Sequence, residues 1–336
     1  MTSVALSSPI RRTGRRRRNL APYLYLLPAF LVMAFITFYP LAFQVWMSFT
    51  DFAQVNFNVR LHVAPHFVGL ENYIDIAESK LAIPNFEFPR LVLFNLWWAL
   101  SNVIVHVVLG VGVAVVLNAK GLWFKGIYRA LYILPVVIPQ IIVATVWRNM
   151  FDTDSGAVNF VIQGIGGIFG LPADTPAFHL DWLHQVNDPI SFIPLPLAYF
   201  AMLTANTWLG WPLNSVVATG ALQSIPGELY EAAEMDGASP WQKFRNVTVP
   251  FLRPAMLPYA IYGFVITFNL FFLPYFMTGG SPFGRTEILV TQAYRLAYEQ
   301  NLYGVAAAFC VYLFFLLLAV TLVTNRLAQA TKSYAD

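Results

Sequence analysis

The segment 227–250 combines residue types that suit a contact with another protein. Residues 228–235 are strong helix formers, and a glutamate early in the segment suits the positive end of a helix. Gly237 is expected to stop this helix, because glycine adopts positive φ without strain. The small side chains of Ala232 and Ala233 leave the first helix narrow. Such a helix can enter a groove on another protein.

A second short helix is predicted to follow the glycine. Ser239 and Pro240 have the residue types of an N-cap and a first-turn position, and the helix is expected to run through about Asn246. Pro250 is expected to close the segment. The sequence therefore predicts two polar helices that meet at a glycine elbow.

Motifs for catalysis, metal binding or cofactor binding are absent from the sequence. It has no G-x-x-x-x-G-K-[ST] phosphate loop, no G-x-G-x-x-G, no H-E-x-x-H and no Cys/His metal spacing. His106 lies inside an apolar run and could be a proton relay, but no apolar run carries an acidic partner. A neutral, hydrogen-bonded packing role is favoured. The lack of carboxylates in the apolar runs argues against the interpretation of the chain as an ion-coupled secondary transporter. This interpretation stays as an alternative, because backbone carbonyls can bind sodium at broken helices.

The elements that hold these residues are membrane-spanning helices. Hydrophobic residues make up 58% of the 336 residues and charged residues only 11%, with a mean hydropathy of +0.59, whereas soluble chains carry about 25% charge. Each run without Asp, Glu, Lys or Arg is close to or above the length of about 20 residues that crosses a bilayer. The six runs are 19–50, 91–119, 130–147, 189–227, 254–284 and 300–325. The sequence predicts an all-α polytopic membrane protein with six transmembrane helices.

The basic residues predict the orientation of these helices. If both termini are cytoplasmic, 14 of the 20 Lys and Arg residues lie inside, in agreement with the positive-inside rule. Two long loops then face outward, and their composition alone assigns them no role. The expected parts are a cytoplasmic basic arm at 1–20, a first transmembrane helix at 21–50, an extracytoplasmic loop at 51–90, a core transmembrane domain at 91–327 with an extracytoplasmic loop at 148–196 and a cytoplasmic loop at 221–253, and a cytoplasmic tail at 328–336.

One further charge-free run complicates the count of spans. Residues 155–173 include five glycines and are flanked by Asp152, Asp154 and Asp174. Glycine costs about 1 kcal/mol in a helix interior, which disfavours a spanning helix. We expect an outer loop with a short amphipathic or membrane-surface helix. The alternative, a seventh span, would move five Lys and Arg outward.

The 227–250 segment resembles the motif of a known family. The pattern E-A-A-x-x-x-G-x9-I-x-L-P is typical of permease subunits of binding-protein-dependent ABC importers. Val247 and Val249 replace the Ile and Leu of the pattern and keep its apolar character. The matching positions are Glu231, Ala232, Ala233, Gly237 and Pro250.

The resemblance extends along most of the chain and favours carbohydrate importers. Several stretches are similar to the larger maltose-type permease. They are Tyr25 to Pro28, Tyr39 and Pro40, Ser48 to Thr50, Tyr128 to Pro135, Trp147 to Asp152, Gly156 to Asn159 and Thr278 to Pro282. The sequence therefore resembles a sugar-importer permease, with a glycerol phosphodiester or another non-sugar solute as the alternative.

The resemblance also implies a fold, a location and a set of partners. The fold would be that of type I ABC importer permeases, in the bacterial inner membrane. The partners would be a second homologous permease, two ATPase subunits, an extracytoplasmic solute-binding protein, membrane lipid and a sugar, with no nucleic acid. The ATPase subunits would bind ATP and Mg, and this chain would bind no cofactor. Coupling to the ATPase would fall to Glu231, Ala232, Ala233, Asp236, Gly237 and Pro250. A non-transporting membrane scaffold is a weaker alternative, because it leaves this segment unexplained.

A solute site is expected on the fourth and fifth spans. Sugars offer both hydroxyl groups and apolar faces, which amides, hydroxyls and aromatic rings can bind. The resemblance puts Asn206 and Gly210 at solute-lining positions by their distance from Glu231, and Asn269 by its distance before Thr278. The candidate residues are Asn206, Gly210, Trp211, Asn214, Tyr262, Thr267, Phe268 and Asn269. The alternative is that the asparagines join helices by hydrogen bonds.

Overall fold

The computed structural model describes residues 21–58, 63–119, 121–172, 175, 178–190 and 193–328. The basic arm at 1–20 and most of the tail, 329–336, lie outside the described residues. The described chain is helical, with a single isolated β-bridge between Thr50 and Phe67. The all-α prediction is confirmed.

The chain divides into two compact units, Met1–Trp46 and Met47–Asp336. The first contains α1 (Ala21–Met33), a π-turn (Ala34–Phe38) and most of α2 (Tyr39–Met47), which follow one another without a break. The π-turn ends two residues before Pro40. Because a proline ring collides with the carbonyl four residues earlier, a locally wider helix accommodates it.

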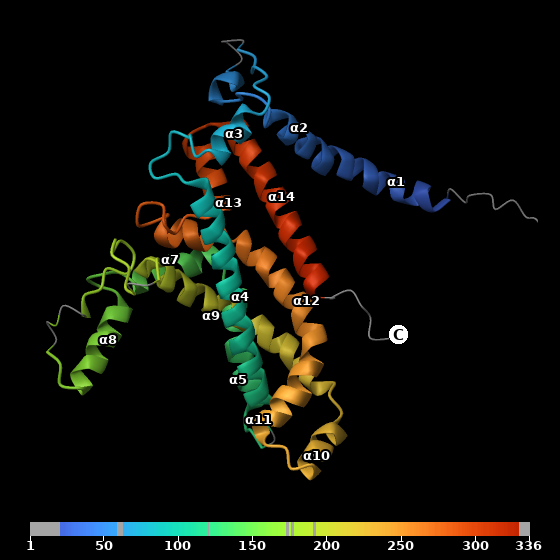
Figure 1. The fold of residues 1–336 in the computed structure, drawn as a ribbon, viewed down its shortest axis with the longest axis vertical. Helices are drawn as coiled ribbons and strands as arrows, with labels where there is room; N and C mark the ends of the chain where they lie inside the picture. Colours follow the sequence, from blue (N-terminus) through green and yellow to red (C-terminus); the bar gives the residue numbers. More distant parts are fainter. Residues whose placement is uncertain are drawn as a thin grey trace, which may run out of the picture. The chain divides into compact units, whose positions relative to one another are not determined.

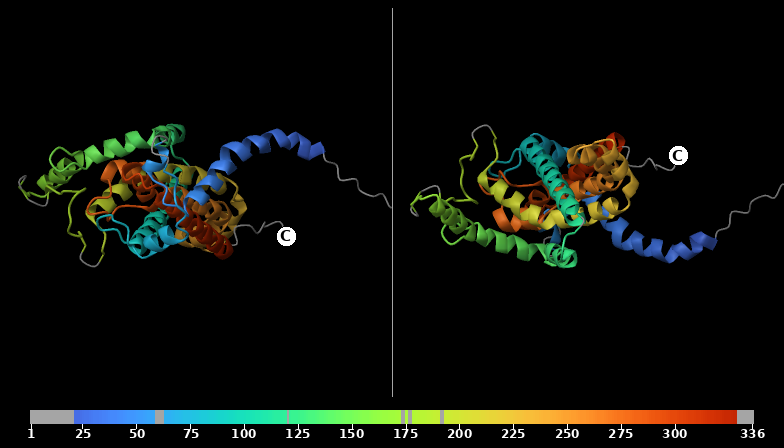
Figure 2. Two further views of the ribbon diagram at one scale, coloured as in Figure 1. Left: turned by 90° about the horizontal axis from the view of Figure 1, so that it is seen from above. Right: turned by 90° about the horizontal axis from the view of Figure 1, so that it is seen from below.

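The second unit is a bundle of long helices with short helices at both ends (Figure 1). Within it, α4 packs most extensively on α9, and α12 contacts both. Figure 2 shows α5, α7 and α8 (green) extending along one side of these helices. The helices are α3 (Glu71–Ala77), α4 (Phe88–Asn118), α5 (Lys125–Tyr132), α6 (Leu134–Val137), α7 (Gln140–Met150), α8 (Ala157–Ile168), α9 (Leu197–Gln223), α10 (Gly227–Met235), α11 (Pro240–Lys243), α12 (Val249–Phe268), α13 (Leu289–Tyr294) and α14 (Tyr303–Ala328).

Four helices in the described part of the chain are long and apolar enough to span a membrane: Tyr23–Met47, Phe88–Asn118, Pro240–Phe268 and Tyr303–Arg326. The helices α5 to α7 form a fifth candidate if the bent pair is one span. The 27 residues of α9 contain no charged residue, although this helix is not among the spans that hydropathy selects. The count of six and the side of each terminus therefore stay predictions.

The third apolar run, 130–147, is not one straight helix. Lys125–Val137 and Gln140–Met150 meet at an angle of 96°. Ile138 between them has extended backbone angles, φ −78° and ψ 130°. Pro139 follows it, and a proline disfavours the helical region for the residue before it. The expectation of a single helix here is wrong, and Pro139 provides the physical reason.

Pro250 does not close the second elbow helix. The chain passes from α11 through a π-turn (Phe244–Thr248) into α12 without leaving the helix, and Pro250 lies in the first turn of α12. The π-turn again ends two residues before the proline, as it does at Pro40. The expected end was wrong because local widening of the helix can accommodate a proline ring.

The charge-free run at 155–173 contains α8, a helix of 12 residues, as expected for this loop. Asn159 anchors it by donating to the carbonyls of Thr153 and Leu180 at 2.9 and 3.0 Å. Its apolar side chains are partly exposed, with Phe160 and Ile168 among the exposed ones. Contact of α8 with the membrane surface stays a prediction.

Candidate coupling segment and solute site

The elbow after α10 is a Schellman motif centred on Gly237. Its φ of +75° lies in the left-handed region, as predicted. The Gly237 amide donates to the Glu234 carbonyl at 3.0 Å, and the Ala238 amide donates to Ala233 at 2.9 Å. Glycine is favoured here because a side chain in this conformation costs about 1–2 kcal/mol.

The start of α11 is a capping box. The Ser239 hydroxyl accepts from the Gln242 amide at 3.3 Å, and the Ser239 amide donates to the Gln242 side chain at 2.7 Å. Pro240 occupies the first turn, where its missing N–H leaves no partner unsatisfied. The predicted N-cap and first-turn residues are confirmed. The segment between α9 and α12 is therefore a defined structure.

Two side-chain contacts hold α10 against the start of the next helix. Tyr230 and Thr248 share a hydrogen bond of 2.9 Å between their hydroxyl groups. Lys243 forms an ion pair with Glu234 at 3.6 Å. Tyr230 also packs against a core cluster that includes Leu222 and Met256 of α9 and α12. These contacts connect α10 to the ends of both helices.

The residues expected to couple to the ATPase lie on the surface of this segment. Glu231, Ala232 and Asp236 are exposed, and Ala233 is half-buried. Pro250 is exposed on the first turn of α12 rather than on the elbow. Figure 1 shows α10 and α11 projecting together at one end of the bundle. Their exposure leaves these side chains available to a partner.

A polar seam joins α4 to α9. The buried amide of Asn206 donates to Asn102 Oδ1 at 2.7 Å. Two turns along, a Cβ added to Gly110 would lie 2.4 Å from Asn214 Cβ, so the helices are in close contact there. The two pairs share an offset of 104 residues, which means that the helices are parallel. Ala114 and Ala218, at the same offset, are fully buried.

His106 occupies the middle of this seam, at the same offset from Gly210. The imidazole is buried and hydrogen-bonds the main chain of Asn206. A Cβ on Gly210 would lie 2.1 Å from the His106 ring, so only glycine leaves room for it. The packing role that the sequence favours for His106 agrees with these contacts.

The contacts of Asn206, Gly210 and Asn214 favour the alternative in which these residues join helices. Asn206 and Asn214 are buried, and the Asn214 amide donates to the Gly210 carbonyl within α9 at 3.0 Å. All three face α4 rather than an open cavity. Their contact with solute stays a prediction.

The other predicted solute residues are not brought together. Phe268 and Thr267 are buried, Phe268 within the apolar core. Trp211 packs on Tyr132 with ring centres 5.3 Å apart. Tyr262 is 58% exposed. Asn269 caps the end of α12, and its amide donates to the Val265 carbonyl at 2.9 Å.

Asn95 has a role that the sequence analysis missed. Its fully buried amide donates to the Phe268 carbonyl at 3.1 Å and accepts from the Leu289 amide at 2.7 Å. It thus joins the end of α12 to the start of α13. Asn95 lies seven residues, or two helical turns, before Asn102 and therefore on the same face of α4. This spacing in the sequence could have indicated that both asparagines face neighbouring helices.

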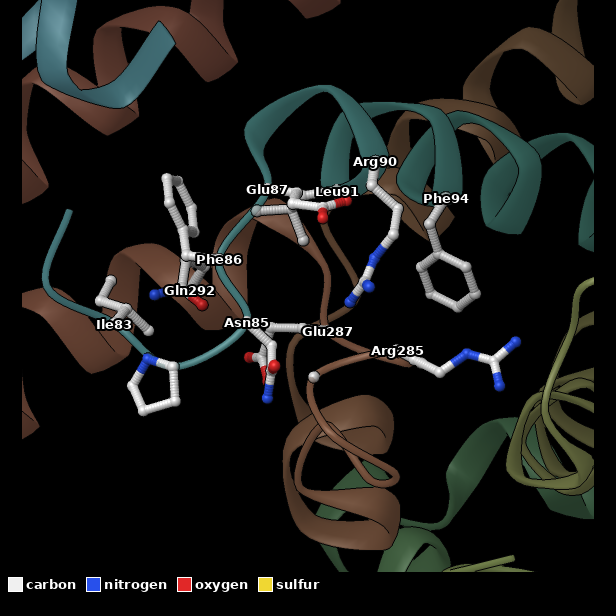
Figure 3. A pocket seen from close by; sticks show the side chains of 12 residues that line it. Ile83, Asn85, Phe86, Glu87, Arg90, Leu91, Phe94, Arg285, Glu287 and Gln292 are labelled. Carbon is white, nitrogen blue, oxygen red and sulfur yellow. The ribbon is translucent and has the colours of Figure 1, made fainter. Parts of the chain in front are cut away.

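A small polar cavity lies at the N-terminal end of α4, where Arg90 and Phe94 contribute to its lining (Figure 3). Its volume is about 40 Å³, and its lining includes Arg90, Glu287 and Gln292. Since one water needs about 10–15 Å³ of such volume, the cavity has room for a few waters and is too small for a sugar.

The loop that follows the fifth apolar run is held by Arg295. Its guanidinium pairs with Glu287 at 3.2 Å and Glu299 at 3.0 Å, and donates to the Gly279 carbonyl at 2.9 Å. Partial burial lowers the pKa of Arg295, but the two carboxylates raise it more, so the net pKa lies above its usual value. The Thr278–Pro282 stretch is thereby fixed to the helices behind it.

The chain matches a family model and many curated proteins. The model of the binding-protein-dependent transport system inner membrane component covers residues 106–332. The galactooligosaccharides transport system permease protein GanP of Bacillus subtilis is 30% identical over 94% of this chain and 71% of its own. The trehalose/maltose transport system permease protein MalF of Thermococcus litoralis is 28% identical over 90% of this chain and 91% of its own.

A solved structure has the same fold. A chain of a bacterial ABC transporter involved in the import of the acidic polysaccharide alginate matches with a TM-score of 0.72, at 18% identity, over 94% of this chain and 97% of the other. No group of three or more His, Cys, Asp or Glu residues able to hold a metal occurs within the described ranges. The family match and the apolar helices identify this chain as a multi-pass permease of the binding-protein-dependent transport system inner membrane component family.

Proposed function

We propose that this chain is the permease subunit of an ATP-driven importer that moves a di- or oligosaccharide across the inner membrane by alternating access. The single observation that carries the proposal is the folded segment at 227–248. It ends α10 with a Schellman motif, starts α11 with a capping box and exposes Glu231 and Ala232. A well-defined and exposed elbow of this kind is suited to contact with a partner protein.

The segment would transmit the closing of an ATPase dimer to the membrane helices. Glu231, Ala232 and Asp236 would contact the ATPase, while Gly237 sets the angle between the two short helices. Tyr230 would carry the motion to α12 through its hydrogen bond with Thr248. The chain would contribute no ATP or Mg site itself.

The other partners would be a second homologous permease and an extracytoplasmic solute-binding protein. GanP and the two MalC relatives from Streptococcus pneumoniae are permeases for galactooligosaccharides and maltodextrin by name, which supports a sugar as the solute. A solved alginate transporter contains a periplasmic protein with a bound alginate pentasaccharide, which supports delivery of the solute by a binding protein.

Within the predicted solute site, Trp211, Tyr262 and Asn269 are the residues best placed to contact sugar. Tyr262 is exposed, and Trp211 and Asn269 are half-buried. The side-chain nitrogen of Asn269 donates to the Val265 carbonyl of α12. Its side-chain oxygen would then be left to accept a hydrogen bond from a sugar hydroxyl. The second permease would complete the site.

The test is uptake of labelled oligosaccharides into proteoliposomes that contain the full complex. We expect uptake to require internal ATP and the solute-binding protein, and to persist when sodium and proton gradients are abolished. Gradient-driven uptake without ATP would instead establish a secondary transporter. The variant Glu231→Lys reverses an exposed charge and should uncouple ATP hydrolysis from uptake, while Glu228→Lys on the same helix provides a matched control.

A further inference from the structure

An apolar groove lies between α4 and α12, beside the second coupling helix. Its volume is about 610 Å³, within the range of about 300–1,000 Å³ that is typical of ligand sites. Trp241 and Phe244 form the end of the groove next to α11. The remaining lining residues are Val107, Val108, Val111, Gly112, Val249, Leu252, Arg253, Met256, Leu257 and Ala260.

The groove continues toward α14. A second cavity of about 360 Å³ shares Arg253, Leu257 and Ala260 with the first and is bounded by Val320 and Thr324 of α14. The two cavities together form a long trough on the surface of helices that are apolar enough to span a membrane. Such a shape fits an extended hydrocarbon chain.

Arg253 is the charged group common to both cavities. It is exposed, and it forms no ion pair with any carboxylate in the described ranges. The sequence has no Asp or Glu between Asp236 and Glu287 that could neutralise it, while Arg245 lies nearby in the chain. An unpaired arginine at the border of an apolar trough is complementary to an anionic headgroup.

Trp241 supports the same assignment. It is 66% exposed and stacks on Phe244 with ring centres 5.5 Å apart. Tryptophan is enriched at the membrane interface, where lipid headgroups lie. The nearly complete lack of polar lining residues also argues against a sugar as the occupant, because its hydroxyl groups would have no partners.

We propose that this trough binds an anionic phospholipid, with an acyl chain between α4 and α12 and the phosphate on Arg253. The bound lipid packs against Trp241 and Phe244 and so supports α11 from the membrane side. The inference does not depend on which solute is transported.

The test measures lipid retention by the full-length chain. The purified protein is incubated in detergent with equal amounts of phosphatidylglycerol and phosphatidylcholine of the same acyl composition, and retained lipids are counted by native mass spectrometry. We expect preferential retention of phosphatidylglycerol. Arg253→Gln should reduce that preference by about tenfold, as expected for the loss of a charge-assisted contact.

A matched pair of variants on α4 tests the location. A Cβ on Gly112 meets no atom within 4 Å, so Gly112→Trp can place its indole in the trough and should lower retention of both lipids. Val116→Trp, one turn further along, replaces a side chain that is 63% exposed and outside the trough, and should have no effect. Arg253→Gln keeps the test informative if Gly112→Trp does not fold.

Three outcomes would overturn the proposal. The first is equal retention of the two lipids by the unmodified chain. The second is unchanged retention in both Arg253→Gln and Gly112→Trp. The third is efficient crosslinking of a Val108→Cys, Cys310→Ser variant to the second permease in the assembled complex, which would show that a protein occupies the trough.

Discussion

Asn206 of α9 and Asn102 of α4 are joined by a buried hydrogen bond of 2.7 Å between their side chains. Asn102 in turn donates to the Trp98 carbonyl at 2.7 Å, so both its side-chain oxygen and its side-chain nitrogen are hydrogen-bonded. In an apolar surrounding an unpaired amide is costly. The pair therefore ties the two helices together at one register.

The variant Asn206→Leu tests this role. Interhelical hydrogen bonds in membranes are worth about 0.6 kcal/mol on average and up to about 1.7 kcal/mol, so we expect a lower melting temperature, with ATPase activity and uptake reduced in parallel. The double variant Asn102→Leu, Asn206→Leu should recover part of the stability, because no partner is left unpaired. Loss of uptake with normal stability and ATPase activity would instead favour solute contact by Asn206.

The contact between Gly210 and His106 predicts a steric defect with a specific rescue. Gly210→Ala should separate α9 from α4, because its Cβ would lie 2.1 Å from the His106 ring. Gly220→Ala on the same helix meets no atom within 4 Å and should stabilise by about 0.5–1 kcal/mol. Adding His106→Ala to Gly210→Ala should restore the yield of folded protein in size-exclusion chromatography. Failure of that rescue would mean that the glycine has another role.

The left-handed conformation of Gly237 predicts a graded effect of substitution. Gly237→Ala should destabilise the elbow by about 1–2 kcal/mol, whereas Gly237→Asn should be milder because asparagine tolerates this region. Since a Cβ here meets no neighbouring atom, the difference reports on backbone conformation alone. Uptake per ATP hydrolysed should decrease in the order glycine, asparagine, alanine. Equal coupling in all three would show that the left-handed turn is not required.

Removing Arg295 should leave a buried carboxylate unpaired. The Glu287 side chain is 8% exposed, and breaking a buried pair on one side costs about 3–5 kcal/mol. We expect Arg295→Gln to melt at a lower temperature than the unmodified protein.

In the unmodified protein the contribution of Arg295 to stability should not change near neutral pH. Because the two carboxylates raise the pKa of Arg295 above its usual value, its contribution to stability is complete below the ordinary arginine pKa and is lost only as the pH rises through the raised folded pKa. Melting curves of the two proteins between about pH 5 and 8 provide the comparison. If Arg295→Gln melted at the same temperature as the unmodified protein throughout this range, the role of Arg295 would be contradicted.

The orientation of the chain can be tested by cysteine labelling in a Cys310→Ser background. We expect a membrane-impermeant maleimide to label Ser79→Cys from outside and Ser239→Cys only after permeabilisation. Both positions are in the described chain, one before and one after α4 in the sequence. We also expect labelling from outside at Ser191→Cys, a position that lies outside the described residues. Labelling of Ser239→Cys in intact cells would refute the six-span topology.

The local structure of the coupling segment could be predicted because its signals are short-range. Gly237 and Ser239 act through their own backbone angles and through residues within five positions of them. The break at Pro139 was missed because composition records that a run is apolar, but not the direction in which it continues. Pro250 was misassigned because a π-turn, which has no clear sequence signature, accommodates it.

The seam between α4 and α9 could not be derived from either helix alone. Asn206, Gly210 and Asn214 share one face of a helix, and this spacing suits a cavity as well as a neighbouring helix. Their partners Asn102, His106 and Gly110 lie about a hundred residues away in the chain. Only the register between the helices distinguishes the two interpretations, and this register depends on tertiary packing.

The constant offset of the seam restricts how the bundle can move. His106 packs on Gly210, and Asn102 is paired with Asn206. These two contacts fix the register, so neither helix can rotate or slide without separating from the other. Any switch between states must carry α4 and α9 together as one lever. We expect the pivots of such a switch at the places where the helices are interrupted, at Ile138 before α7 and at Asn269 after α12.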